Sequence, residues 1–160
     1  MIFITLGSQK FQFNRLLKAV DSQVAEGKIR DDIFAQVGDS DYVPMNYNYK
    51  DFLNRDEFIE WQCKADIVIT HGGTGAIIGA VKKRKKVIAV PRLAKYGEHV
   101  DDHQLQLIEQ FKDLNLIYEC LDCDSIWKAI EIVKTMEFKE YISNTNRIID
   151  NIDRYISKEA

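Results

Sequence analysis

The chain has 160 residues, of which 46% are hydrophobic and 29% charged, a balance typical of one globular domain with a single core. Its formal net charge of −3 argues against a general nucleic-acid-binding protein, which normally carries a basic excess. No apolar run approaches the roughly 20 residues of a membrane-spanning helix, and the first residues lack the pattern of a signal peptide. We therefore expect a cytoplasmic protein in which Cys63, Cys120 and Cys123 are ordinary thiols.

Short apolar runs alternate with helical patterns along most of the chain. Nearly continuous runs of this kind are typical of parallel strands that are covered on both faces. The predicted strands are Ile2–Leu6, Ile33–Val37, Ile67–Thr70, Val87–Val90 and Leu116–Tyr118. Helical spacing between them predicts helices around Leu16 to Val24, Phe58 to Gln62, Ile77 to Val81 and Leu105 to Phe111. The alternation predicts an α/β fold with a doubly wound parallel sheet.

Three polar loops directly follow predicted strands. The first is Gly7-Ser8-Gln9, the second runs from His71 to Gly75, and the third runs from Pro91 to Gln104. Doubly wound sheets bind ligands at the carboxyl ends of their strands, beside the point where the strand order reverses. We therefore expect the three loops to converge at one edge of the sheet.

The second loop, His71-Gly72-Gly73-Thr74-Gly75, joins a strand to a helix. Its glycines let a ligand approach the backbone closely, and the free N–H groups and dipole of the helix's first turn favour an anion. The loop therefore predicts a phosphate or diphosphate site. The alternative is a plain structural turn, because glycines also serve that purpose.

The run Lys82-Lys83-Arg84-Lys85-Lys86 joins a helix to the start of a strand, which places it at the edge of the sheet opposite the ligand crevice. We expect a solvated connection. The alternative is contact with anionic lipid headgroups.

The third loop is unusually polar for a connection between a strand and a helix. Arg92 and Lys95 are suited to a diphosphate. Glu98, Asp102 and Gln104 are suited to hydroxyl groups, because carboxylates and amides can bind sugar hydroxyls. A phosphate bound by one loop and hydroxyls bound by the next together describe a nucleotide-sugar. The alternative is a solvated loop whose aspartate caps the following helix.

The histidine pair of the third loop could in principle bind a metal ion. His99 and His103 are four residues apart, but the start of a helix falls between them and no third ligand is implied, so no metal site is expected.

Near the end of the chain, Ile142, Ile149 and Ile156 repeat every seven residues, as do Phe138, Thr145 and Ile152. We expect a long amphipathic helix over residues 135–160 of a single domain 1–160. It packs on its own sheet or contacts a partner chain.

The order of these motifs resembles the donor-binding, C-terminal half of GT-B glycosyltransferases of family 28. The resemblance rests on Gly7-Ser8-Gln9, His71 to Gly75, Pro91, and Asp102-His103-Gln104, and covers about residues 1–135. It is strongest with one-domain catalytic subunits of two-component transferases, namely bacterial PssE-type capsule and exopolysaccharide galactosyltransferase subunits and the dolichol-pathway N-acetylglucosaminyltransferase subunit. It implies a Rossmann-like domain that forms one half of a GT-B fold.

The resemblance also implies roles for individual residues. The diphosphate would lie on His71, Gly72, Gly73, Thr74 and Gly75, with Gly7, Ser8 and Gln9 beside it. Asp102 and Gln104 would hold hydroxyls of the donor sugar, and His103 between them would belong to the same UDP-sugar site. Many members place a ribose-binding glutamate eight residues after the histidine, where this chain has Gly79. Glu98 is a candidate replacement. The catalytic base would come from another subunit.

The expected function is therefore that of a UDP-sugar-dependent, inverting hexosyltransferase subunit that needs no metal. The sugar is galactose, or else N-acetylglucosamine, and the acceptor is a lipid-diphosphate-linked saccharide presented by a membrane-anchored partner. The chain would lie at the inner face of the membrane, with Arg92 and Lys95 stabilising the leaving diphosphate. The alternatives are an NADP-binding oxidoreductase domain and a non-catalytic module that stabilises a partner enzyme.

Overall fold

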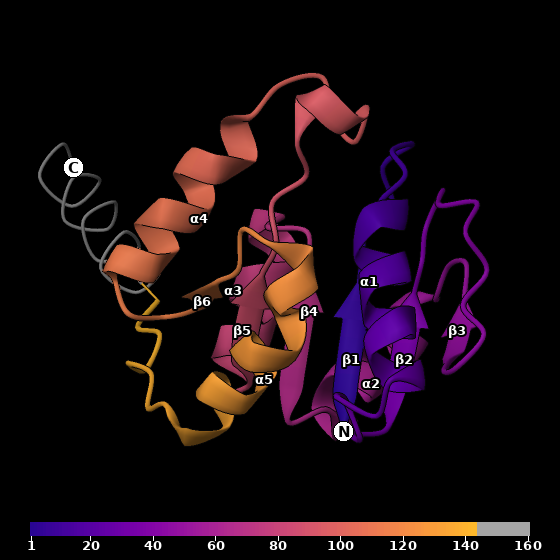
Figure 1. The fold of residues 1–160 in the computed structure, drawn as a ribbon. Helices are drawn as coiled ribbons and strands as arrows, with labels where there is room; N and C mark the ends of the chain where they lie inside the picture. The colour runs from indigo at the N-terminus through magenta and orange to yellow at the C-terminus, as the bar shows by residue number, and fades with distance from the viewer. Residues whose placement is uncertain (144–160) are drawn as a thin grey trace, which may run out of the picture.

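The computed structural model describes residues 1–143 and contains a parallel sheet of six strands, in the order β3-β2-β1-β4-β5-β6 (Figure 1). The strands are β1 (Ile2–Thr5), β2 (Ile33–Gln36), β3 (Asn48–Lys50), β4 (Ile67–Thr70), β5 (Lys86–Ala89) and β6 (Tyr118–Glu119). The chain adds strands on one side of β1 and then returns to add β4 on the other side. The strand order therefore reverses between β1 and β4, and a doubly wound sheet binds its ligand at this point.

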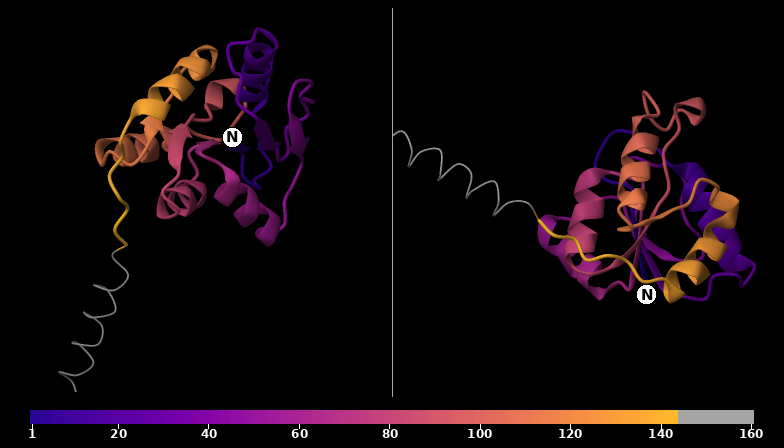
Figure 2. Two further views of the ribbon diagram at one scale, coloured as in Figure 1. Left: turned by 90° about the horizontal axis from the view of Figure 1, so that it is seen from below. Right: turned by 90° about the vertical axis from the view of Figure 1, so that its left-hand side faces the viewer.

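Helices cover both faces of the sheet. Their bounds are α1 (Asn14–Ala25), α2 (Arg55–Lys64), α3 (Thr74–Lys82), α4 (His103–Asp113) and α5 (Ile126–Thr135). Buried side chains of α1 and α5 pack on one face, while those of α2, α3 and α4 pack on the other. The left panel of Figure 2 shows the strands between these two layers. The predicted doubly wound α/β fold is thus confirmed.

One β-strand and one α-helix of the described residues were not predicted. Strand β3 lies at the edge of the sheet, and all three of its residues are exposed, so it has no apolar run. Helix α5 buries Ile126, Ala129, Ile130 and Val133, which recur at helical spacing. The strand predicted at Leu116–Tyr118 is β6, which begins two residues later, at Tyr118. The apolar residues Leu116 and Ile117 are buried but precede the strand.

The helix expected over residues 135–160 does not begin where it was predicted. Helix α5 ends at Thr135, and residues 136–143 are irregular. Phe138 packs against the core on one face of the sheet and Tyr141 against the core on the other, so their spacing reflects a chain that passes the edge of the sheet. The remaining residues of the predicted heptad pattern, from Thr145 to Ile156, lie outside the described residues.

The basic run is largely occupied by contacts within the domain. Lys86 Nζ donates to the carbonyl oxygens of Val133 and Lys134 at 2.9 and 2.6 Å, at the end of α5. Lys85 Nζ donates to Cys63 O, near the end of α2, at 2.6 Å, and Arg84 pairs with Glu140. Cations at helix carboxyl termini are favourable because they meet unpaired carbonyl groups. The basic run therefore links the start of β5 to the ends of α2 and α5. Neither the solvated connection nor the lipid contact considered from the sequence included this role.

Candidate functional site

A cavity of about 700 Å³ lies where the strand order reverses. Its walls come from the ends of β1 and β2, the Gly7-Ser8-Gln9 loop, the glycine loop after β4, and one side each of α2 and α3. The first two of the three predicted loops therefore meet here. Residues of the third loop do not line this cavity.

His71 sets the shape of the glycine loop. Its ring lies between Gly7 and Gly73, so that a Cβ on Gly7 would come 2.7 Å from His71 Cε1 and a Cβ on Gly73 would come 2.5 Å from Nε2. Only glycine fits at both positions, and Gly7 in addition has a φ of +75°. Burial, helped by the nearby charge of Arg92, lowers the His71 pKa to about 4. The ring is therefore neutral near pH 7 and acts as a spacer between the two loops.

The N-terminus of α3 is open to a ligand. Gly73 is the N-cap residue, and no side chain caps this end of the helix. Thr74 and Gly75 are exposed, and a Cβ on Gly75 would meet no atom within 4 Å. Uncapped N–H groups together with the helix dipole form an anion-binding site. This geometry fits the predicted phosphate site.

Buried polar groups line the same cavity. Thr5 Oγ1, Gln36 Oε1 and Gln62 Nε2 are buried and have no hydrogen-bond partner among the described residues. Such groups are unfavourable unless a ligand or water satisfies them. None of the three was predicted from the sequence as a site residue. A glutamine within an otherwise apolar helical pattern, as at Gln62, was the available signal.

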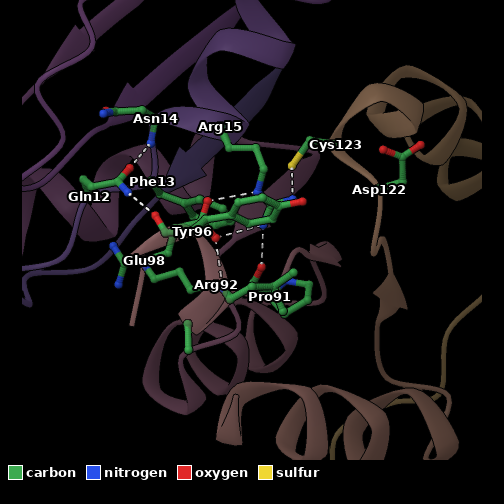
Figure 3. Close-up of polar contacts among 12 residues, drawn as sticks. Gln12, Phe13, Asn14, Arg15, Pro91, Arg92, Tyr96, Glu98, Asp122 and Cys123 are labelled. Atoms are coloured by element: carbon green, nitrogen blue, oxygen red, sulfur yellow. Dashed lines mark hydrogen bonds and ion pairs between the residues drawn. The ribbon is translucent and has the colours of Figure 1, made fainter. Parts of the chain in front are cut away.

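Arg92 and Glu98 do not face the cavity, and the roles expected for them are not supported. Arg92 is fully buried, and its Nη2 donates to the carbonyl oxygens of Leu6 and Phe11 at 2.8 and 2.9 Å. Glu98 is also fully buried and forms an ion pair with Arg15 (Figure 3). Glu98 would have to leave Arg15 to reach a ribose. Arg92 Nε and Nη1 have no hydrogen-bond partner among the described residues, but the side chain is enclosed and does not line the cavity. We therefore assign them to the internal support of the third loop.

Of the other candidates in the third loop, Lys95, Asp102 and His103 are exposed, whereas Gln104 is buried. Lys95 is exposed, and its Nζ lies 4.8 Å from the centre of the Tyr96 ring. Asp102 and His103 are exposed at the start of α4, where Asp102 Oδ1 accepts a hydrogen bond from the Ala94 N–H at 2.8 Å. Gln104 is 7% exposed, and its Oε1 accepts from the Arg92 N–H at 3.2 Å.

The third loop nevertheless approaches the first. Gln12 Nε2 donates to Tyr96 O at 3.1 Å, and the rings of Phe11 and His99 lie 4.8 Å apart. Figure 1 shows this loop and the start of α4 beyond the carboxyl ends of the strands. The convergence expected of the three loops is therefore seen, although the third lies beside the cavity rather than in its wall.

Neither cysteine nor metal chemistry is indicated within residues 1–143. All three cysteines are free, and burial raises the pKa of the Cys120 thiol to about 11 and that of Cys123 to about 12. No group of three or more His, Cys, Asp or Glu residues in this range is arranged to hold a metal ion. Nor does this range include a helix with the length and apolar character needed to cross a bilayer.

The sequence is similar to two curated proteins. It is 31% identical over 112 residues to the UDP-N-acetylglucosamine transferase subunit ALG13 of Candida albicans, covering 70% of this chain and 31% of that protein. It is 26% identical over 123 residues to the tRNA dimethylallyltransferase 2 of Phocaeicola vulgatus, covering 72% of this chain and 39% of that protein. The chain thus spans less than half the length of either relative.

Solved structures support the fold. The calicheamicin glycosyltransferase CalG4 matches with a TM-score of 0.65 at 20% identity, over 85% of this chain and 34% of that one. The solution structure of ALG13 matches with a TM-score of 0.58 at 18% identity, over 94% and 93% of the two chains. Acinetobacter baumannii MurG matches with a TM-score of 0.58 at 16% identity, over 84% and 41%.

A family model covers nearly the whole chain. The model of the glycosyltransferase family 28 C-terminal domain matches residues 1–158. The half-domain fold, the glycine loop at the point where the strand order reverses, and this match agree. The chain belongs to the glycosyltransferase family 28 C-terminal domain family.

Proposed function

We propose that the chain is the donor-binding subunit of an inverting hexosyltransferase. It would bind a UDP-sugar, with galactose favoured over N-acetylglucosamine, for transfer to a lipid-diphosphate-linked saccharide in polysaccharide biosynthesis, such as that of a capsule or exopolysaccharide. A membrane-anchored partner would supply the acceptor and the catalytic base. The chain would then lie at the cytoplasmic face of the membrane through that partner.

One observation carries the proposal: the uncapped start of α3 opens into a cavity that also contains unpaired buried polar groups. The helix terminus suits the diphosphate, and the rest of the cavity is large enough for further polar parts of a nucleotide. Gly7, Ser8 and Gln9 form the wall next to the glycine loop, consistent with contact to the diphosphate. Membership of family 28 supports sugar transfer as the chemistry.

The proposed reaction is a single displacement. An acceptor hydroxyl attacks the anomeric carbon of the donor, the bond from that carbon to the UDP oxygen breaks, and the partner's base takes the hydroxyl proton. Negative charge then grows on the leaving diphosphate. The groups proposed to stabilise this charge without a metal ion are the N-terminus of α3 and the exposed Lys95.

Asp102, His103 and Gln104 are proposed to contact the donor sugar. They occupy the start of α4, directly after the third loop, whose Tyr96 O accepts a hydrogen bond from Gln12 Nε2 in the connection between β1 and α1. Among the described residues, no hydrogen bond engages the amide nitrogen of Gln104, so it is free to donate to a hydroxyl. This step extends the site from the diphosphate to the transferred sugar.

The NADP-binding alternative is less consistent with the topology. A dinucleotide-binding glycine motif follows the first strand of its sheet, whereas Gly73, Gly75 and Gly79 follow β4. Arg92, which would have met a 2′-phosphate, is fully buried. No structural feature favours this alternative over a nucleotide-sugar.

The test is a ligand panel measured by calorimetry and thermal unfolding. We expect UDP and a UDP-hexose to bind and NADP to have no effect; a ligand at 100 times its dissociation constant adds about 2.7 kcal/mol of stability. Stabilisation by NADP alone would contradict the proposal. Transfer of labelled sugar by the chain reconstituted with its membrane partner then separates an enzyme subunit from a non-catalytic module.

A further inference from the structure

The side-chain amide of Gln62 in α2 is held in one orientation but is only half satisfied. Gln62 is 1% exposed, and its Oε1 accepts a hydrogen bond from Lys83 Nζ at 2.8 Å. Lys83 Nζ also donates to Gly79 O at 3.3 Å. Because an ammonium group can only donate, Lys83 fixes the amide so that its NH2 group points away from Lys83. Within residues 1–143, Nε2 has no hydrogen-bond partner.

The amide lies beside Gly79 of α3, which has no side chain to fill the space next to it. A Cβ built on Gly79 would come 3.4 Å from Gln62 Nε2 and 3.5 Å from Oε1, and its three nearest neighbours within 4 Å all belong to Gln62. The missing side chain of Gly79 therefore leaves room beside the amide. Gln62, Gly79 and Lys83 all line the cavity that contains the glycine loop. A ligand oxygen cannot occupy the Cβ position itself, which is bonded to Gly79 Cα, and would approach Nε2 from the cavity beside Gly79, at a hydrogen-bonding distance of about 3 Å.

Helix geometry relates this space to the phosphate site. Gly75, Gly79 and Lys83 are spaced four residues apart and so lie along one side of the helix. At a rise of 1.5 Å per residue, Gly79 is about 6 Å and Lys83 about 12 Å along the axis from Gly75. If the phosphates lie at the start of α3 and the nucleoside extends along this side of the helix, the ribose lies at about the level of Gly79.

We propose that Gln62, positioned by Lys83, binds the ribose of the nucleotide through a hydrogen bond from Nε2 to a ribose hydroxyl oxygen. This inference rests on the proposed function, because it takes the diphosphate to lie at the N-terminus of α3. The ribose is the first part of the nucleotide after the phosphates, and it carries neutral hydroxyl groups that can accept a hydrogen bond from Nε2. Gln62 is thus a specificity residue for a ribonucleotide, and Lys83 is its positioning residue.

The experiment compares UDP, 2′,3′-dideoxy-UDP and inorganic pyrophosphate, each titrated by calorimetry against the wild-type chain and Gln62→Leu. Loss of one neutral hydrogen bond should weaken UDP binding about fivefold to tenfold. Wild type should prefer UDP over the dideoxy analogue, and Gln62→Leu should lose most of that preference while binding pyrophosphate as before.

Lys83→Met and Lys82→Met form a matched pair for the positioning role. Both remove one positive charge, but Lys82 is exposed, does not line the cavity and lies 5.7 Å from the Tyr141 ring centre. Lys83→Met should reduce the preference for UDP over its dideoxy analogue, and Lys82→Met should not.

The outcomes separate the two proposals. A wild-type chain that binds neither UDP nor pyrophosphate overturns the proposed function and this inference with it. If wild type binds UDP but Gln62→Leu keeps the full preference over the dideoxy analogue, only the role of Gln62 is overturned. Equal weakening of UDP and pyrophosphate in a folded Gln62→Leu chain would also overturn it, because the contact would then involve the phosphates or the fold.

Discussion

Arg15 and Glu98, which are 83 residues apart in sequence, form a bidentate ion pair that links the third loop to α1. Arg15 Nε donates to Glu98 Oε1 and Arg15 Nη2 to Oε2, both at 2.9 Å (Figure 3). Glu98 Oε2 also accepts from the Leu93 N–H at 2.9 Å, and Arg15 Nη2 donates to Pro91 O at 3.0 Å. The loop that approaches the candidate site is thus held by one buried carboxylate.

Glu98→Gln should therefore destabilise the fold rather than act on a ribose. Removal of one partner of a buried ion pair leaves the other charge uncompensated and costs about 3 kcal/mol. The matched control is Glu60→Gln, which breaks the exposed pair between Glu60 and Lys64 and should cost about 0.5 kcal/mol or less. Urea unfolding of both variants measures the difference. A Glu98→Gln chain of unchanged stability that binds UDP less tightly would return Glu98 to the ligand site.

The strands could be predicted because burial on both faces makes a parallel strand nearly all apolar. The residues Ile67–Thr70 are such a case, since all four are buried and the predicted bounds are confirmed. Asn48–Lys50 carries no such signal, because this edge strand pairs with β2 only and all three of its residues are exposed. Periodicity near the C-terminus was misleading in the described part, because Phe138 and Tyr141 pack on opposite faces of the sheet.

The candidate site could be predicted only where chemistry is local in sequence. The glycine loop is recognisable because glycines and the helix start are adjacent. Arg92 and Glu98 were predicted to bind the ligand because both are charged. The sequence does not show that Arg92 donates to Leu6 O or that Glu98 pairs with Arg15, because these partners are distant in sequence. The sequence pattern could mark Gln62 as a polar residue of a helix but not as a ligand group, because its relation to Gly79 exists only after α2 and α3 pack together.

His71 should make stability depend on pH in the acid range. Its pKa is about 4 in the folded chain against 6.5 for an unburied histidine, so the unfolded chain binds more protons between these values. Stability is therefore complete above pH 6.5 and is lost as the pH falls toward 4, by about 3 kcal/mol in all. His71→Gln, which cannot be protonated, should show a flatter profile in urea unfolding between pH 4 and 7. Parallel profiles for the two chains would mean that His71 is not buried in its neutral form.

The anion site at α3 can be tested with Gly75→Glu and Gly75→Gln, which add side chains of equal size. A Cβ at this position meets no atom within 4 Å, so both should fold, whereas a Gly73 substitution would displace the His71 ring. A carboxylate near a helix N-terminus favours folding but repels a diphosphate. Gly75→Glu should thus be at least as stable as Gly75→Gln yet bind UDP about tenfold more weakly. Equal UDP affinities, measured by calorimetry, would place the phosphates elsewhere.

Gln104 gives the sharpest test of where the transferred sugar lies. Its Oε1 accepts from the Arg92 N–H, so truncation to alanine would disturb the loop as well as any ligand contact. Gln104→Glu keeps an oxygen for the Arg92 N–H and replaces only the NH2 group proposed to donate to a sugar hydroxyl.

Gln104→Glu places a carboxylate at a position that is only 7% exposed, so some stability and some affinity for UDP itself should be lost. The quantity to compare is therefore the extra affinity for a UDP-sugar over UDP, in which this shared loss cancels. The extra affinity for the UDP-sugar should fall by about 1 kcal/mol or more, the value of a lost hydrogen bond in a buried site. Paired titrations of UDP and UDP-galactose give this difference directly, and UDP-N-acetylglucosamine repeats it for the second candidate sugar. Equal losses for UDP and the UDP-sugars would show that Gln104 supports the phosphate loop, and the sugar would then have to lie on Asp102 and His103 without it.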